Sequence, residues 1–168
     1  MLKVLLMILI YLLIRKRVTE LRFDINKLNK YYEIGDSQKL ISLAYSYESN
    51  ITYVKEEEYV ELVKLLKFML EKVYDMKERD VQEAFFHVIE KTININFGKC
   101  EKFKEVIDLV IKRIELNFMT SWKLAESLLI ISATMDKNYS AIMSKYMEHG
   151  DSYVREVVKE YFINISQI

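Results

Sequence analysis

The feature that most constrains the fold of this chain is its shortage of turn-forming residues. The 168 residues include no proline and only three glycines, Gly35, Gly98 and Gly150. Sandwiches and barrels need many sharp turns, which glycine and proline supply, so the composition disfavours them. A glycine-rich phosphate loop is also excluded, because no two glycines lie within about fifty residues of each other. We therefore predict an all-α protein.

The pattern of apolar residues indicates how the helices are divided. Apolar residues make up 51% of the chain and charged residues 30%, which is typical of amphipathic helices in one folded domain. Apolar positions recur at spacings of three and four residues, separated by short polar breaks. Four pairs of helices are predicted: Thr19 to Tyr32 with Ser37 to Ser49, Glu56 to Tyr74 with Asp80 to Ile95, Lys102 to Leu116 with Ser121 to Met135, and Tyr139 to Glu148 with Ser152 to Ile165.

Two glycine–aspartate dipeptides punctuate the predicted pairs. Gly35-Asp36 and Gly150-Asp151 each stand between a first and a second helix. Glycine readily takes the left-handed backbone that ends many helices, and an aspartate side chain accepts a hydrogen bond from the first turn of the next. Asp80 is predicted to cap the second helix of its own pair. We therefore expect each second helix to open on a capping residue.

A short pattern recurs in the second helices: an apolar residue, a polar or small residue, a glutamate and two inward-facing residues. Leu40, Val81 and Leu124 recur at intervals of about 40 residues, and Val154 follows sooner, as terminal repeats often do. The segment from Asp151 to Val158 resembles the second helix of a HEAT repeat, and Asp80 to Ala84 is a weaker match. The pattern stands at Val81-Gln82-Glu83-Ala84-Phe85, Leu124-Ala125-Glu126-Ser127-Leu128 and Val154-Arg155-Glu156-Val157-Val158.

The resemblance to HEAT repeats implies a fold and a binding surface. It implies a short right-handed α-solenoid of about four antiparallel hairpins over residues 19–168, with the second helices lining a concave binding face. An irregular helical bundle is the alternative, because helices joined by short loops also bundle.

Residues 1–17 form a distinct N-terminal unit ahead of the helical domain predicted for residues 18–168. Leu2 to Ile14 is almost wholly apolar and is followed by the basic cluster Arg15 to Arg17. A basic cluster after the run, with no small-residue cleavage site, disfavours a signal peptide. Two interpretations stay open. The segment is either a buried or partner-docking helix, for which thirteen residues suffice, or a membrane anchor that keeps the remaining chain cytoplasmic.

No constellation of residues predicts catalysis, metal binding or a cofactor. His87 has Glu83 and Glu90 on the same helix, but the Glu-x-x-His motif of di-iron bundles does not occur. Cys100 precedes a helix without a visible base to activate it. As the only cysteine it forms no internal disulfide, which suits a reducing cytoplasm. We expect a non-enzymatic, cytoplasmic protein.

The outward positions of the predicted second helices carry the predicted partner-binding surface. They combine carboxylates, bases and apolar anchors, as protein interfaces do. Lysine plus arginine equals aspartate plus glutamate at 25 each, so no net charge attracts nucleic acid. The predicted partner-binding residues are Gln82, Glu83, Phe86, Glu90, Glu126, Arg155, Glu156 and Lys159.

These observations favour an interaction adaptor or scaffold, such as an immunity or inhibitor-type protein, that binds another protein through its second helices. A cytoplasmic helical domain tethered to the inner face of the membrane by residues 2–14 is one alternative. A helical-repeat protein that binds nucleic acid is another.

Overall fold

The computed structural model describes residues 23–116 and 119–168. Within these residues every regular element is a helix and no strand occurs, which confirms the all-α prediction. The predicted N-terminal unit of residues 1–17 lies outside the described residues. Within the described ranges, no helix combines the length and the apolar run that crossing a bilayer requires.

The helices follow the predicted pairs closely. The eight α-helices and three short 3-10 turns of the described residues are α2 (Ile25–Glu33), α3 (Ser37–Ile51), η1 (Glu56–Glu58), α4 (Tyr59–Val73), α5 (Arg79–Asn96), η2 (Phe97–Lys99), α6 (Phe103–Glu115), α7 (Ser121–Ser132), η3 (Lys137–Tyr139), α8 (Ser140–Ser144) and α9 (Ser152–Ser166). The helix predicted from Tyr139 to Glu148 is wrong in length, because α8 ends at Ser144 and gives way to turns.

Three of the four second helices open on a capping side chain, and two of these caps, Asp36 and Asp151, are the predicted ones. Asp36 accepts a hydrogen bond from the Lys39 amide, and Asp151 accepts from the amides of Tyr153 and Val154. Thr120 caps α7 in the same way, through the Lys123 amide. Each cap satisfies an amide that has no partner within its helix.

Two details of the predicted helix ends are wrong. Asp80 is not a cap, because α5 already begins at Arg79, and Glu78 in the N-cap position makes no side-chain cap bond. Gly35 has the left-handed backbone expected of it, with φ of 68°, but Gly150 does not share it. The two glycine–aspartate dipeptides therefore share the aspartate cap and not the glycine turn.

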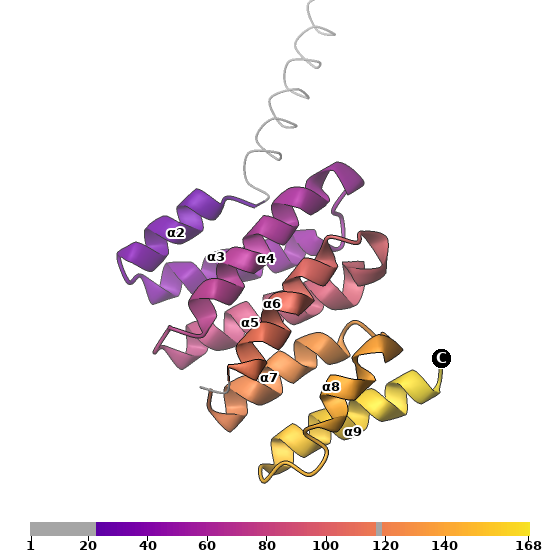
Figure 1. The fold of residues 1–168 in the computed structure, drawn as a ribbon. Helices are drawn as coiled ribbons and strands as arrows, with labels where there is room; N and C mark the ends of the chain where they lie inside the picture. Colours follow the sequence, from indigo (N-terminus) through magenta and orange to yellow (C-terminus); the bar gives the residue numbers. More distant parts are fainter. Residues whose placement is uncertain (1–22, 117–118) are drawn as a thin grey trace, which may run out of the picture.

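The helices form two layers (Figure 1). The second helices pack side by side in chain order, α3 on α5, α5 on α7 and α7 on α9. Each first helix packs on its own second helix, and α4 also lies beside α6. Figure 1 shows the pairs following one another from the indigo α2 to the yellow α9. Apolar side chains from both layers make one continuous core between them.

The first pair and the last pair are each held together by a buried tyrosine, which links the second helix to the start of its own pair. Tyr47 on α3 donates its hydroxyl to the Asp24 carbonyl over 2.7 Å, and Tyr161 on α9 donates to the Asp136 carbonyl over 2.7 Å. Asp24 and Asp136 are the N-caps of α2 and η3, the elements that open these two pairs. A fully buried hydroxyl needs such a partner, because an unsatisfied one would cost about 1–3 kcal/mol.

Candidate partner-binding surface

The outward side of the second-helix layer gathers carboxylates from three helices, α3, α5 and α7, with a tyrosine of α9 beside them. Its centre is α5, where Glu83, His87 and Glu90 recur at spacings of four and three residues and share one side of the helix. Neighbouring helices cover the other sides of α5, since α3, α4 and α7 all pack against it. We call this surface the carboxylate face and define it by Glu48 of α3, Glu83 and Glu90 of α5, Glu126 of α7 and Tyr153 of α9.

Gln82 and Phe86, both predicted to be exposed on this face, are buried. Gln82 is 5% exposed and donates its side-chain amide to the Met76 carbonyl, so it holds the loop before α5. Phe86 is 1% exposed and packs edge-on against two rings, Tyr74 at 5.8 Å and Trp122 at 5.7 Å between centroids. The prediction was wrong because α7 covers a side of α5 that the sequence pattern left open.

Glu126 and Tyr153 join α7 to α9 on the carboxylate face. The Tyr153 hydroxyl donates to Glu126 Oε1 over 3.1 Å. Burial raises the pKa of Glu126, and the negative charges of Glu83 and Glu90 raise it further. Burial and the nearby Glu126 carboxylate raise the pKa of Tyr153 to about 12. The effect of the Glu83 and Glu90 charges on the pKa of Glu126 indicates that these three carboxylates lie near one another.

Glu90 is the least compensated carboxylate on this face. It is half-buried, and among the described residues it has no ion pair or hydrogen bond through its carboxylate. Burial raises its pKa, although the charges of His87 and Lys91 pull the value down. A carboxylate that loses water without gaining a cation is an electrostatic cost, which a bound cation would relieve.

The edge of the face toward α3 is neutralised internally. Glu48 pairs with the Lys91 ammonium and lies 3.3 Å from His87 Nε2. The Lys91 hydrogen bond, followed by that of His87, lowers the pKa of Glu48. The Tyr45 ring lies 6.3 Å from the His87 ring and extends the surface. His87 thus bridges α3 and α5 through Glu48.

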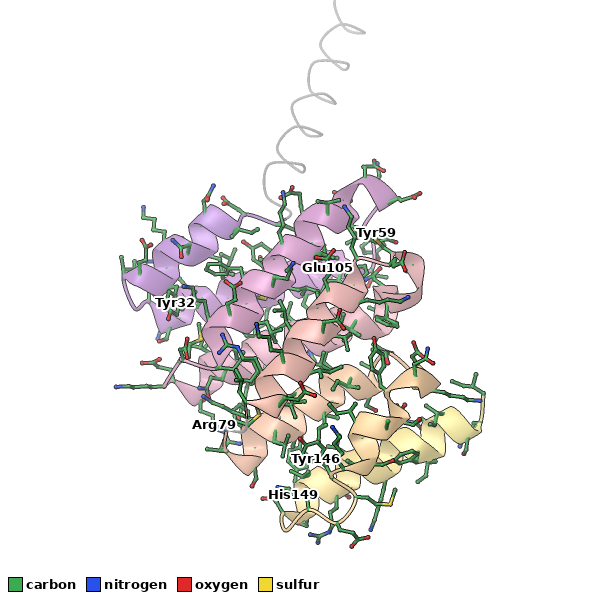
Figure 2. All side chains as sticks on the ribbon, viewed as in Figure 1. Tyr32, Tyr59, Arg79, Glu105, Tyr146 and His149 are labelled. Atoms are coloured by element: carbon green, nitrogen blue, oxygen red, sulfur yellow. The ribbon has the colours of Figure 1, made fainter. Side chains whose placement is uncertain are left out.

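Arg79 closes the other edge of the face, at the start of α5. Its guanidinium pairs with Glu83 over 2.8 Å and lies 4.4 Å from the centroid of the Trp122 ring. Figure 2 labels Arg79 where α5 begins, beside α7. The stacking holds an aromatic ring next to the carboxylates, so apolar surface borders the charged centre.

The predicted residues of α9 divide between two sides of the helix. Arg155 is turned away from the carboxylate face and donates to the carbonyls of His149 and Gly150 over 2.6 and 2.9 Å, which closes the loop before α9. Figure 2 labels His149 in this loop. Lys159, one turn later, is exposed on the same side as Arg155. Glu156 is exposed on the Tyr153 side and acts on the pKa of that tyrosine.

Several residues of the face were missed by the sequence analysis. Glu48 meets Lys91, and Tyr45 meets His87, only through the register of α3 against α5, which no local spacing reveals. Tyr153 stands three residues before Glu156 and could have been found from that spacing. Trp122 stands four residues before Glu126 and could have been found in the same way.

The described residues hold no group of three or more histidine, cysteine, aspartate or glutamate side chains arranged to bind a metal ion. Cys100 is half-buried at the end of η2. Comparisons with protein-family models, with curated proteins and with solved structures each find no match to this chain.

Proposed function

We propose that this protein is a non-enzymatic adaptor or scaffold that binds a partner protein through the carboxylate face. The observation that carries the proposal is the set of carboxylates from α5 and α7, Glu83, Glu90 and Glu126, on one surface. Among the described residues, Glu90 forms no ion pair through its carboxylate, and Glu126 accepts a side-chain hydrogen bond only from the Tyr153 hydroxyl. Half-buried charges of this kind are available for a partner to neutralise.

The proposed architecture is a short right-handed solenoid of about four HEAT-like hairpins. The side-by-side order of α3, α5, α7 and α9 supports it, because stacked hairpins bring their second helices into one row. The first and last pairs share a bond from a buried second-helix tyrosine to the aspartate that opens the pair, at Tyr47 and Tyr161, which also supports a common unit. An irregular bundle is the alternative, and in a bundle the same bond would not be expected to recur at equivalent positions of different pairs.

The partner that fits the carboxylate face is a basic segment with an apolar or aromatic side chain. Lysine or arginine side chains would offset the charges of Glu90 and Glu126, and a flat apolar group would pack beside Trp122 and Tyr153. The same carboxylates would repel phosphate groups, which favours a protein over a nucleic acid.

Affinity capture from the native cell with charge-reversed variants tests the proposal. The tagged full chain is compared with the triple variant Glu83→Lys, Glu90→Lys and Glu126→Lys, and captured proteins are quantified by mass spectrometry. The matched control reverses three exposed carboxylates away from this surface, Glu57→Lys, Glu101→Lys and Glu115→Lys, and so changes the net charge equally.

The proposal expects a partner that the wild type and the control capture equally and the face variant loses by about tenfold or more, since each reversed contact removes a charged hydrogen bond. Melting curves confirm that each variant is folded. Equal capture by a folded face variant would contradict the proposal.

A further inference from the structure

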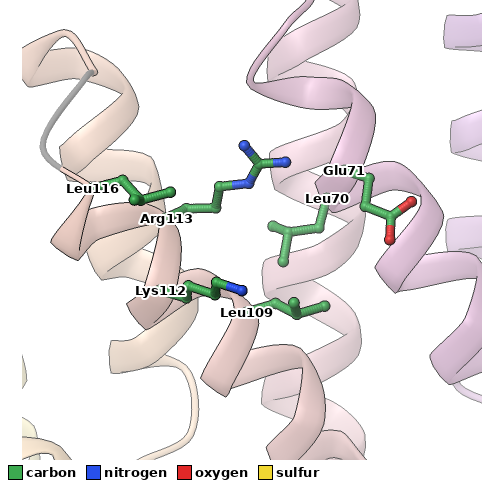
Figure 3. Close-up of a pocket in the computed structure, with 6 residues that line it drawn as sticks. All are labelled: Leu70, Glu71, Leu109, Lys112, Arg113 and Leu116. Atoms are coloured by element: carbon green, nitrogen blue, oxygen red, sulfur yellow. The ribbon is translucent and has the colours of Figure 1, made fainter.

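A second surface with a different chemistry lies on the first-helix layer, between α4 and α6. A cavity of about 300 Å³ opens there, lined by Leu70 and Glu71 of α4 and by residues of α6 and its end. Figure 3 shows the remaining lining residues, Leu109, Lys112, Arg113 and Leu116, on the facing side. This volume is at the lower end of the range for ligand sites, roughly 300–1,000 Å³.

The cavity continues into a second hollow. A space of about 150 Å³ is lined by Tyr74, Asp75, Met119 and Lys123 and shares Arg113 and Leu116 with the first. The two hollows therefore form one trough, which we call the α4–α6 trough. Its apolar lining residues are Leu70, Leu109, Leu116 and Met119, of which Leu116 is half exposed.

The cations of the trough are not neutralised by its acids. Arg113 lies 5.4 Å from the centroid of the Tyr74 ring, and among the described residues no carboxylate lies within ion-pair distance of it. In Figure 3 the Glu71 carboxylate points away from the Arg113 guanidinium. The ammonium of Lys123 is held by the Tyr74 carbonyl over 2.7 Å. Arg113 therefore presents unpaired donors where the two hollows meet.

We infer that the α4–α6 trough is a second docking site, for an acidic and apolar segment of a partner protein. An apolar side chain of the segment fills the hollow between Leu70, Leu109 and Leu116. A neighbouring carboxylate receives the guanidinium of Arg113, with Lys112 beside it, because a planar guanidinium pairs in two-point fashion with a carboxylate.

The shape of the trough favours a peptide segment over a small amphiphile. Small ligands are usually enclosed over most of their surface, whereas this trough is open along one side and has two successive hollows. Two hollows separated by one charged group suit alternating side chains of a chain. The site is separate from the carboxylate face, and it binds an acidic segment where the carboxylate face binds a basic one.

The test uses a random-peptide phage library selected on the immobilised full chain, followed by affinity measurements on the enriched peptides. Binding is compared among wild type, Arg113→Glu and Lys112→Glu. The control is Lys104→Glu, an exposed lysine nearer the start of the same helix. Dodecanoate is measured in parallel as the small-amphiphile probe. Melting curves accompany each variant, and Lys112, which is exposed, guards against a folding defect of Arg113→Glu.

We expect enriched peptides that pair apolar with acidic residues and bind at least about tenfold more weakly to Arg113→Glu, with a smaller loss for Lys112→Glu and none for Lys104→Glu. Methyl spectra should then shift at Leu70, Leu109 and Leu116. Enrichment of basic peptides only, peptides indifferent to Arg113 and Lys112, or no enrichment would overturn the inference. Dodecanoate shifting these methyls without any trough-dependent peptide would overturn it in favour of a small amphiphile.

Discussion

The carboxylate face and the α4–α6 trough differ in both charge and construction. The face lies on a continuous row of helices, where α5 and α7 each have a second helix on either side and only their outward polar side chains remain free. The trough lies between two first helices and includes their C-terminal turns, where Leu116 is left half exposed. The continuous row of second helices leaves a charged surface, whereas the gap between α4 and α6 leaves a hollow.

The signs of the two surfaces also have a local origin. Lys112 and Arg113 stand in the last turn of α6, where cations interact favourably with the helix dipole. The carboxylates of α5 and α7 project from a layer whose inward sides are apolar. The net charge of the chain is zero, and it conceals two surfaces of opposite sign. Total charge is therefore a poor guide to the partners of this protein.

The largest expected effect on stability comes from replacing the residue that contacts both regions. The Phe86 ring contacts Tyr74, which lines the trough, and Trp122, which borders the face. Phe86→Ala should lower the free energy of unfolding by about 3–5 kcal/mol, since it empties a fully buried site. Urea denaturation measures the change. Ile163→Ala, at a position 56% exposed on α9, is the control and should change little. A loss for Phe86→Ala below about 1 kcal/mol would contradict the view that this buried ring holds the two regions together.

A smaller effect on stability is expected from removing one hydroxyl in each region, that of Tyr74 in the trough or that of Tyr153 on the face. Ser127 donates its own hydrogen to the Lys123 carbonyl, so the Tyr74 hydroxyl donates to Ser127 over 2.8 Å in a partly buried site. Tyr74→Phe should cost about 1 kcal/mol. Tyr153→Phe removes an exposed bond to Glu126 and should stay within about 0.5 kcal/mol. Equal costs in thermal unfolding would contradict the expectation that the partly buried Tyr74 hydroxyl contributes more to stability than the exposed Tyr153 hydroxyl.

The smallest expected effect is the pH dependence of two carboxylates. Burial raises the pKa of Glu90 above its ordinary value of 4.5, so its ionisation costs stability as pH rises past that value. Glu90→Gln should therefore be more stable than wild type at pH 7, and the advantage should vanish below about pH 4.

Glu105 of α6, in the first-helix layer, should show a pH dependence of stability opposite to that of Glu90. Its hydrogen bond to Lys67 of α4, 2.8 Å long, lowers its pKa, so its contribution is present above pH 4.5 and is lost as pH falls. Glu105→Gln should be slightly less stable than wild type at pH 7. Melting temperatures between pH 3 and pH 8 measure both variants, and the same sign for both would contradict the contrast between the layers.

The helices and part of the face could be predicted from the sequence. Spacings of three and four residues placed the helix pairs and put Glu83 and Glu90 on one outward side, because such spacing is local. Gln82 and Phe86 were misplaced because their burial depends on where α7 crosses α5. Arg155 was misplaced because loop carbonyls, which no sequence pattern marks, bind its guanidinium. The trough was not predicted, since a gap between α4 and α6 depends on the packing of two helices far apart in the chain.

The most direct test of the proposed role of the carboxylate face is zero-length crosslinking of the captured partner. A carbodiimide joins a carboxylate to a lysine amine only where the two groups touch. Peptide mapping should find partner lysines joined to Glu83, Glu90 or Glu126. Partner lysines joined only to carboxylates outside this face, such as Glu57 or Glu101, would contradict the account.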